Sequence, residues 1–138
     1  MRVVIDNNII VDALKPNTEF QAEAQMILRF AAEKKIDGYV SASSLTDIFY
    51  VLRKEHNAEK TKEMIRTLMS FTDTIPLTAS DCTDALDLPM NDFEDAVVAI
   101  CAAKIGADYI VSRDEAFATS AAAVVKVIKP DALLPMVG

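Results

Sequence analysis

The chain has 138 residues, of which 51% are hydrophobic and 25% charged, and this balance excludes a disordered or collagen-like protein. That length and apolar content suit one packed domain, which we expect to span residues 1–138. With 14 Lys and Arg against 21 Asp and Glu, the net charge is −7, which argues against a protein that binds nucleic acid through bulk positive charge.

Local sequence disfavours a membrane protein, a secreted protein and a protein with a cysteine metal or redox site. No apolar run approaches the length of a membrane span, and Asp6 interrupts the N-terminus before a signal-peptide core could form. Cys82 and Cys101 have neither metal-site nor redox spacing, so we expect reduced, packed thiols. These features favour an untargeted cytoplasmic protein.

Hydrophobic periodicity predicts strands that alternate with helices along the chain. Residues 3–5 form a β-branched run that ends at Asp6, as a strand buried on both faces would. Further strands are expected at residues 38–41, 74–77, 109–111 and 124–128. Helices are expected at residues 9–14, 20–35, from Ser43 or Ser44 through 52, 58–71, 80–86, 92–104 and 115–119. This order predicts an α/β fold, a three-layer α/β/α arrangement with a mainly parallel central sheet of about five strands.

Acidic residues follow or flank the predicted strands. Asp6 follows the first strand, Asp47 starts the helix after the second, Asp92 and Asp95 open the helix before the fourth, and Asp114 follows the fourth. In an open α/β sheet the ligand site lies beyond the carboxyl ends of the strands, so these side chains are expected to converge. Converging carboxylates repel one another unless a cation lies between them, and oxygen ligands select hard ions such as Mg²⁺ or Mn²⁺.

A purely structural role remains open at each of these positions, because acidic side chains also cap helix N-termini. Ser44-x-x-Asp47 and Asp92-x-x-Asp95 both have the spacing of a capping box. Asp114 can cap the short helix that follows it, and Asp6 can cap the helix that begins at Ile9.

Signals for other chemistries are weak or absent. The sequence has no dinucleotide-binding, P-loop or serine-hydrolase motif, and His56 is expected on a solvated helix end. Five basic residues lie close together in sequence: Arg53, Lys54, Lys60, Lys62 and Arg66. A group of this kind usually indicates a solvated surface, although it could hold a phosphate backbone beside a metal site.

Three segments together resemble the PIN-domain ribonucleases. Residues 4–12 (VIDNNIIVD) look like the opening motif of that family, residues 92–96 (DFEDA) like its third acidic motif, and residues 110–114 (IVSRD) like its fourth. The resemblance spans nearly the whole chain, whose length is that of VapC-type toxins from toxin–antitoxin pairs.

The resemblance implies a metal-dependent endoribonuclease with Asp6, Asp47, Asp95 and Asp114 as catalytic residues. Asp6, Asp95 and Asp114 would bind one or two Mg²⁺ or Mn²⁺ ions, and Asp47 would bind them more loosely. Supporting roles would fall to Asn8, Asp92 and Ser112. It also implies an RNA substrate, a cognate antitoxin protein and a homodimer, with no membrane association.

The chain departs from the family pattern at two positions that bear on activity. Asn7 stands where Thr or Ser is usual, and Asp47 takes the place of a Glu. One alternative is therefore a catalytically weak PIN-like module that binds RNA or a protein partner. A second is a phosphotransfer domain of the receiver or haloacid-dehalogenase type, but the dehalogenase signature needs an aspartate at position 8, where this chain has Asn8.

Overall fold

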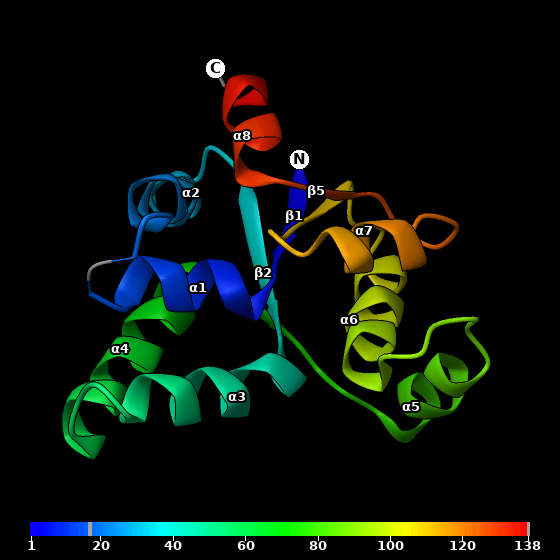
Figure 1. Cartoon of the computed structure of the whole chain (residues 1–138), viewed down its shortest axis with the longest axis horizontal. Helices are drawn as coiled ribbons and strands as arrows, with labels where there is room; N and C mark the ends of the chain where they lie inside the picture. The colour runs from blue at the N-terminus through cyan, green and yellow to red at the C-terminus, as the bar shows by residue number, and fades with distance from the viewer. Residues whose placement is uncertain (17, 138) are drawn as a thin grey trace.

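A computed structural model describes residues 1–16 and 18–137 as an α/β structure around one five-stranded sheet (Figure 1). The strands are β1 (Arg2–Ile5), β2 (Asp37–Ser41), β3 (Asp73–Ile75), β4 (Tyr109–Val111) and β5 (Val127–Ile128). They lie in the order β3-β2-β1-β4-β5, and every neighbouring pair is parallel. The predicted sheet is thereby confirmed, and it is parallel throughout.

Helices connect the strands and cover both faces of the sheet. They are α1 (Asn7–Leu14), α2 (Gln21–Ala32), α3 (Ala42–Arg53), α4 (Ala58–Phe71), α5 (Ala79–Leu86), α6 (Phe93–Lys104), α7 (Glu115–Ser120) and α8 (Pro130–Leu133), followed by a 3₁₀ turn at Leu134–Met136. In Figure 1 the first four helices lie to one side of the strands, and α5, α6 and α7 lie to the other. The three-layer prediction is confirmed.

Alternating side chains of the strands supply a separate core to each face. Val3 and Ile5 pack with α1 to α4 and α8, whereas Val4 and Ile110 pack with α5, α6 and α7. Val3, Val4 and Ile5 are all fully buried. A strand covered on both faces must be apolar at every position, which is why β1 has no polar residue between Val3 and Asp6.

Several boundaries differ from the sequence-based expectation, and each difference has a local cause. The first helix begins at Asn7 rather than Ile9, because Asp6 caps it directly at the end of β1. The last strand is confined to Val127–Ile128, since residues 121–125 instead form turns bonded back to Ala121. The short helix α8, with Pro130 at its first position, was not predicted.

Candidate active site

The centre of the sheet is where its winding direction changes. β1 pairs with β2 on one side and with β4 on the other. The segment that follows β1 and the segment that follows β4 therefore leave the sheet next to each other, although they lead to helices on opposite faces. Ile5 lies opposite Val111, and the Asp6 amide donates to the Val111 carbonyl over 3.1 Å. In open α/β sheets the usual ligand site lies beyond the carboxyl ends of the strands at such a point, and we call this place between β1 and β4 the crevice.

Asp6 is buried at this point, with 6% of its surface exposed. Its Oδ1 accepts a hydrogen bond from the Asn7 amide at 2.9 Å, and its Oδ2 accepts from Ser112 Oγ at 2.8 Å and from Asn8 Nδ2 at 3.3 Å. Burial raises the pKa of Asp6 above its usual value, and the hydrogen bonds from Ser112 and Asn7 oppose the rise. The side chain is therefore both the cap of α1 and a fixed carboxylate at the crevice.

Asn8 and Ser112 hold the two central strand ends together. Asn8 Nδ2 donates to Ser112 Oγ at 2.9 Å, while Asn8 Oδ1 accepts from the Arg113 amide at 3.3 Å. Ser112 Oγ in turn accepts from the Asp114 amide at 3.1 Å. Fully bonded polar networks of this kind fix side-chain orientation, so Asp6 and the segment after β4 are held in one arrangement.

Helix α6 brings two more carboxylates to the crevice. Asp92 caps the helix, because its Oδ1 accepts from the Asp95 amide at 3.0 Å. Burial and, after it, the negative charges of Asp92, Asp6 and Asp114 together raise the pKa of Asp95 to about 7. These contributions place the carboxylates expected after β1, on α6 and after β4 in the same region of the molecule.

Asp114 begins the short helix α7, as the sequence predicted. Its Oδ1 accepts from the Phe117 amide at 3.1 Å, so the capping function of this residue is confirmed. Capping occupies one carboxylate oxygen and does not exclude a second role for the other.

The expected position of Asp47 within its helix is wrong. The chain passes directly from β2 into α3, with Ser41 as the N-cap, so Asp47 lies in the second turn and Ser44 lies buried inside the helix. Ser44 and Asp47 therefore form no capping box. The Asp47 side chain instead lines a cavity of about 220 Å³ together with Asn7 and Asn8 from α1.

Glu94 is the acidic residue that sequence reasoning missed. Partial burial, a hydrogen bond with Asp47 and the charges of Asp47, Asp92 and Asp6 together raise the pKa of this exposed residue to about 7. Asn7 Nδ2 donates to Glu94 Oε1 at 3.2 Å, so Asn7 connects α1 to α6. Glu94 belongs to the DFEDA segment, and its place in the first turn of α6 beside Asp95 was the available signal.

We call these six residues the acidic cluster: Asp6, Asp47, Asp92, Glu94, Asp95 and Asp114. As the side chains stand, no three Asp, Glu, His or Cys residues among 1–16 and 18–137 form a closed set of metal ligands. The chemistry of the cluster nevertheless fits a hard divalent cation, since its donors are oxygens and, after burial, the neighbouring negative charges help to raise the pKa values of Asp6, Glu94 and Asp95.

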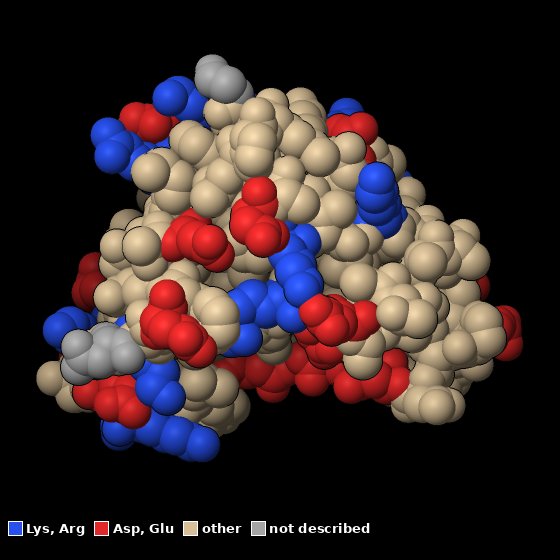
Figure 2. Space-filling view, turned by 45° about the horizontal axis from the view of Figure 1, so that its top comes forward, with Lys and Arg blue, Asp and Glu red and all other residues tan. Residues whose placement is uncertain are grey.

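Acidic and basic side chains are unevenly spread over the surface. Figure 2 shows acidic atoms gathered below the centre of the molecule, with a group of basic atoms directly above them. Among the five basic residues noted between positions 53 and 66, two form ion pairs within α4: Lys62 contacts Glu59 and Arg66 contacts Glu63. These pairs favour a solvated surface at that helix.

His56 lies at a helix end, as expected, but is half-buried rather than fully solvated. It follows the end of α3, and its Nε2 is buried without a hydrogen-bond partner among the described residues.

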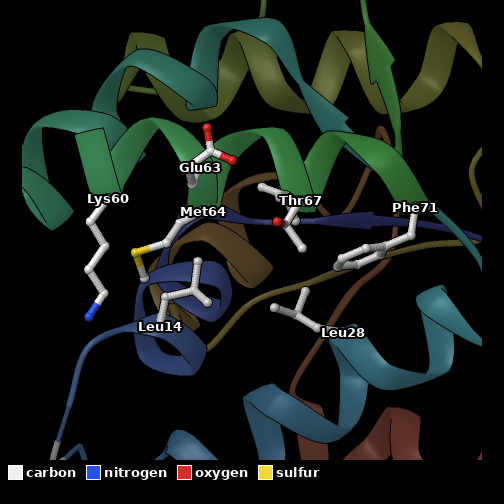
Figure 3. Close-up of a pocket in the computed structure, with 8 residues that line it drawn as sticks. Leu14, Leu28, Lys60, Glu63, Met64, Thr67 and Phe71 are labelled. Carbon is white, nitrogen blue, oxygen red and sulfur yellow. The ribbon is translucent and has the colours of Figure 1, made fainter. Parts of the chain in front are cut away.

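An apolar pocket of about 340 Å³ lies away from the acidic cluster. In Figure 3, Met64, Thr67 and Phe71 of α4 point toward Leu14 of α1 and Leu28 of α2. Lys60 and Glu63 also line it. Within the described part of the chain, no helix is both long and apolar enough to cross a membrane.

A model of the PIN domain matches residues 2–116 of this chain. The chain belongs to the PIN domain family. Ribonuclease VapC1 of Aquifex aeolicus (strain VF5) is 26% identical over 121 residues, an alignment that covers 84% of this chain and 83% of that protein.

Solved structures share the fold of this PIN domain protein. A crystal structure of VapBC2 from Rickettsia felis bound to a promoter DNA fragment contains a chain with a TM-score of 0.72 and 17% identity, over 94% of this chain and 98% of that one. Mycobacterium tuberculosis VapC20, described as a toxin that cleaves the sarcin-ricin loop, gives a TM-score of 0.70 and 18% identity, over 91% and 98% of the two chains.

Proposed function

We propose that this PIN domain protein is a metal-dependent endoribonuclease that hydrolyses RNA phosphodiester bonds, and that it is the toxin of a type II toxin–antitoxin pair. The observation that carries the proposal is the convergence of Asp6, Asp95 and Asp114 at the crevice between β1 and β4. The ribonuclease name of the Aquifex relative and the RNA-cleaving description of the Mycobacterium toxin support the same activity.

Asp6, Asp95 and Asp114 would hold Mg²⁺ or Mn²⁺, with Asp47 and Glu94 at the edge of the site and Asp92 assisting. When bound, the ion supplies Lewis-acid chemistry, because it polarises the scissile phosphate and lowers the pKa of the attacking water. Asn8 and Ser112 keep Asp6 oriented through the hydrogen bonds that both donate to Oδ2.

Glu94 and Asp95 link cation binding to proton release. Their pKa values of about 7 mean that, without a cation, each carries a proton for much of the time near neutral pH. Carboxylates bind a cation in their ionised form, so occupancy of the site releases these protons. The same two groups are the candidates to accept a proton from water near the scissile bond.

The partners we propose are an RNA substrate, a cognate antitoxin protein and a second copy of this chain. The net charge of −7 makes RNA binding through bulk charge unfavourable, and cations in the acidic cluster offset part of that repulsion. Complexes named VapBC among the structures of similar fold support an antitoxin partner. The apolar pocket between α1, α2 and α4 is a surface that a protein partner's apolar side chains would fill.

The test is cleavage of a mixed RNA substrate by purified protein with Mn²⁺ or Mg²⁺, with EDTA, and by an identically purified Asp6→Asn protein. We expect cleavage that requires both the metal and Asp6. Equal cleavage by both proteins would indicate a contaminating nuclease. Absence of cleavage together with absence of metal binding would favour the non-catalytic binding module instead.

A further inference from the structure

Arg113 lies between Ser112 and Asp114, and its side chain is anchored on α1. Its Nε and Nη2 donate to the two carboxylate oxygens of Asp12, with 3.1 Å between Nη2 and Oδ1. Only 7% of the Asp12 side chain is exposed. The guanidinium also lies 4.1 Å from the centre of the Phe20 ring. A bidentate pair with a stacked ring restricts an arginine far more than a single surface contact would.

Asp12 and Asn8 are four residues apart on α1, so they lie on the same face of that helix. Asn8 accepts a hydrogen bond from the Arg113 backbone amide, and Asp12 accepts from the Arg113 side chain. One face of α1 therefore binds the same residue twice, once through its backbone and once through its side chain. The segment after β4 is fixed to the helix that Asp6 caps.

The Asp12–Arg113 pair is not a helix cap, because Asp6 caps α1. Arg113 lines the same cavity as Asp47 of the acidic cluster, yet two of its donors are bound to Asp12. A buried carboxylate is costly unless it is paired, so Asp12 and Arg113 are expected to stay bound to each other. The element that it immobilises is the short connection carrying Ser112 and Asp114.

We propose that Asp12 is a positioning residue for the acidic cluster: by clamping Arg113 it sets where Asp114 and Ser112 stand relative to Asp6. The proposal rests on the proposed metal-dependent function. Asp12 need not touch metal or RNA, since it acts through Arg113 and the hydrogen bonds of Asn8 and Ser112. Removing such an outer partner commonly weakens metal binding by about 10–100-fold.

The Asp81–Lys104 pair is a matched control. Its carboxylate is 6% exposed and its lysine 35% exposed, against 7% and 34% for Asp12 and Arg113. Asp81 belongs to α5, and Lys104 donates to Asp81 and to the Pro76 carbonyl, away from the acidic cluster. Asp81→Asn therefore breaks an equally buried pair without disturbing the connection after β4.

The experiment compares wild type, Asp12→Asn, Arg113→Lys, Asp81→Asn and the double variant Asp12→Asn/Arg113→Lys. Mn²⁺ affinity is measured by electron paramagnetic resonance at low salt and at about 1 M salt, where the screening length is about 3 Å. Amide hydrogen exchange is followed at Arg113 and Asp114 without metal. Arg113→Lys keeps the charge and loses the two-pronged contact, which separates positioning from electrostatics.

We expect Asp12→Asn and Arg113→Lys each to weaken Mn²⁺ binding by about tenfold or more at both salt concentrations. Both should also speed exchange at Arg113 and Asp114. The double variant should bind no more weakly than the worse single variant, because both changes break one interaction. Asp81→Asn should lower stability and leave affinity and exchange at the site unchanged.

The proposal is overturned if Asp12→Asn binds Mn²⁺ as wild type does and leaves exchange unchanged. It is also overturned if Asp12→Asn loses Mn²⁺ affinity only at low salt and Arg113→Lys binds Mn²⁺ as wild type does. That result would mean that Asp12 acts on the site through its charge alone. Should the wild type bind no Mn²⁺, the proposed function fails. Exchange at Arg113 and Asp114 then still decides whether Asp12 positions the segment.

Discussion

Ser112 Oγ donates a hydrogen bond to Asp6 Oδ2 over 2.8 Å and so joins residues 106 positions apart in the chain. The contact exists because β1 and β4 are neighbours, although β2 and β3 come between them in sequence. It places the side chain that caps α1 beside the segment that leads into α7. The position of Asp6 relative to the segment that carries Ser112 and Asp114 thus follows from the order of the strands.

Asp114→Asn separates capping from metal binding at the start of α7. Asparagine caps helices about as well as aspartate, so we expect an unchanged free energy of unfolding without metal. Loss of the negative charge should lower Mn²⁺-dependent RNA cleavage by at least about tenfold. Asp114→Ala is the matched variant, and it should lose about 1 kcal/mol of stability in urea unfolding as well. Full activity in Asp114→Asn would restrict this residue to capping.

The stability of the metal-free protein should fall as pH rises toward 7. Glu94 and Asp95 have folded-state pKa values of about 7 against ordinary values of 4.5 and 3.8. Between these limits the folded state keeps protons that the unfolded chain has released, so the stabilisation present at low pH is lost as pH rises through about 7. Urea unfolding over this range measures the trend.

The double variant Glu94→Gln/Asp95→Asn is the control for that trend. Neither new side chain titrates, so its stability should depend less on pH between about 4 and 7 than that of the wild type. An equal slope in both proteins would contradict the assignment of these two groups.

Asp47→Asn should lower the pKa of Glu94 from about 7, because contact with Asp47 and its charge help to raise it. Burial is the largest cause and remains, so the pKa should stay above its ordinary value. Carboxyl carbon chemical shifts of Glu94, followed by NMR during a pH titration, give the answer. An unchanged Glu94 titration would mean that Asp47 does not face α6.

The elements were predictable from the sequence because their burial patterns are strong. β1 is apolar at Val3, Val4 and Ile5, and α6 buries a continuous run of small and β-branched residues. The helix caps at Asp92 and Asp114 were likewise foreseeable, since capping depends on neighbours in sequence. The expectation that the acidic residues converge came from the parallel order of the strands.

Other features depend on tertiary contacts and were not predictable. The sequence pattern placed Asp47 at the start of a helix, but a direct β2–α3 junction at Ser41 puts that start at Ala42. The proximity of Glu94 to Asp47 and Asn7 arises only when α3, α1 and α6 pack around the crevice. Asp12 and Arg113 are 101 positions apart, so no local sequence pattern predicts their pairing.

Gly38→Ala should destabilise the fold without touching the acidic cluster. A Cβ at this position would lie 2.9 Å from Ala31 Cβ and 3.4 Å from Ile5 Cδ1, so β2 and α2 would have to move apart. Overpacking of this kind costs about 1–3 kcal/mol. Urea unfolding should show that loss, whereas Mn²⁺ affinity of the remaining folded protein should match wild type.

The central claim is that the acidic cluster holds a divalent cation, and thermal unfolding with and without Mn²⁺ tests it most directly. An ion that binds only the folded state raises the melting temperature, by an amount that grows with its concentration. We predict a rise for the wild type and none for Asp6→Asn at the same Mn²⁺ concentrations. An equal rise in both proteins, or no rise in either, would contradict the claim.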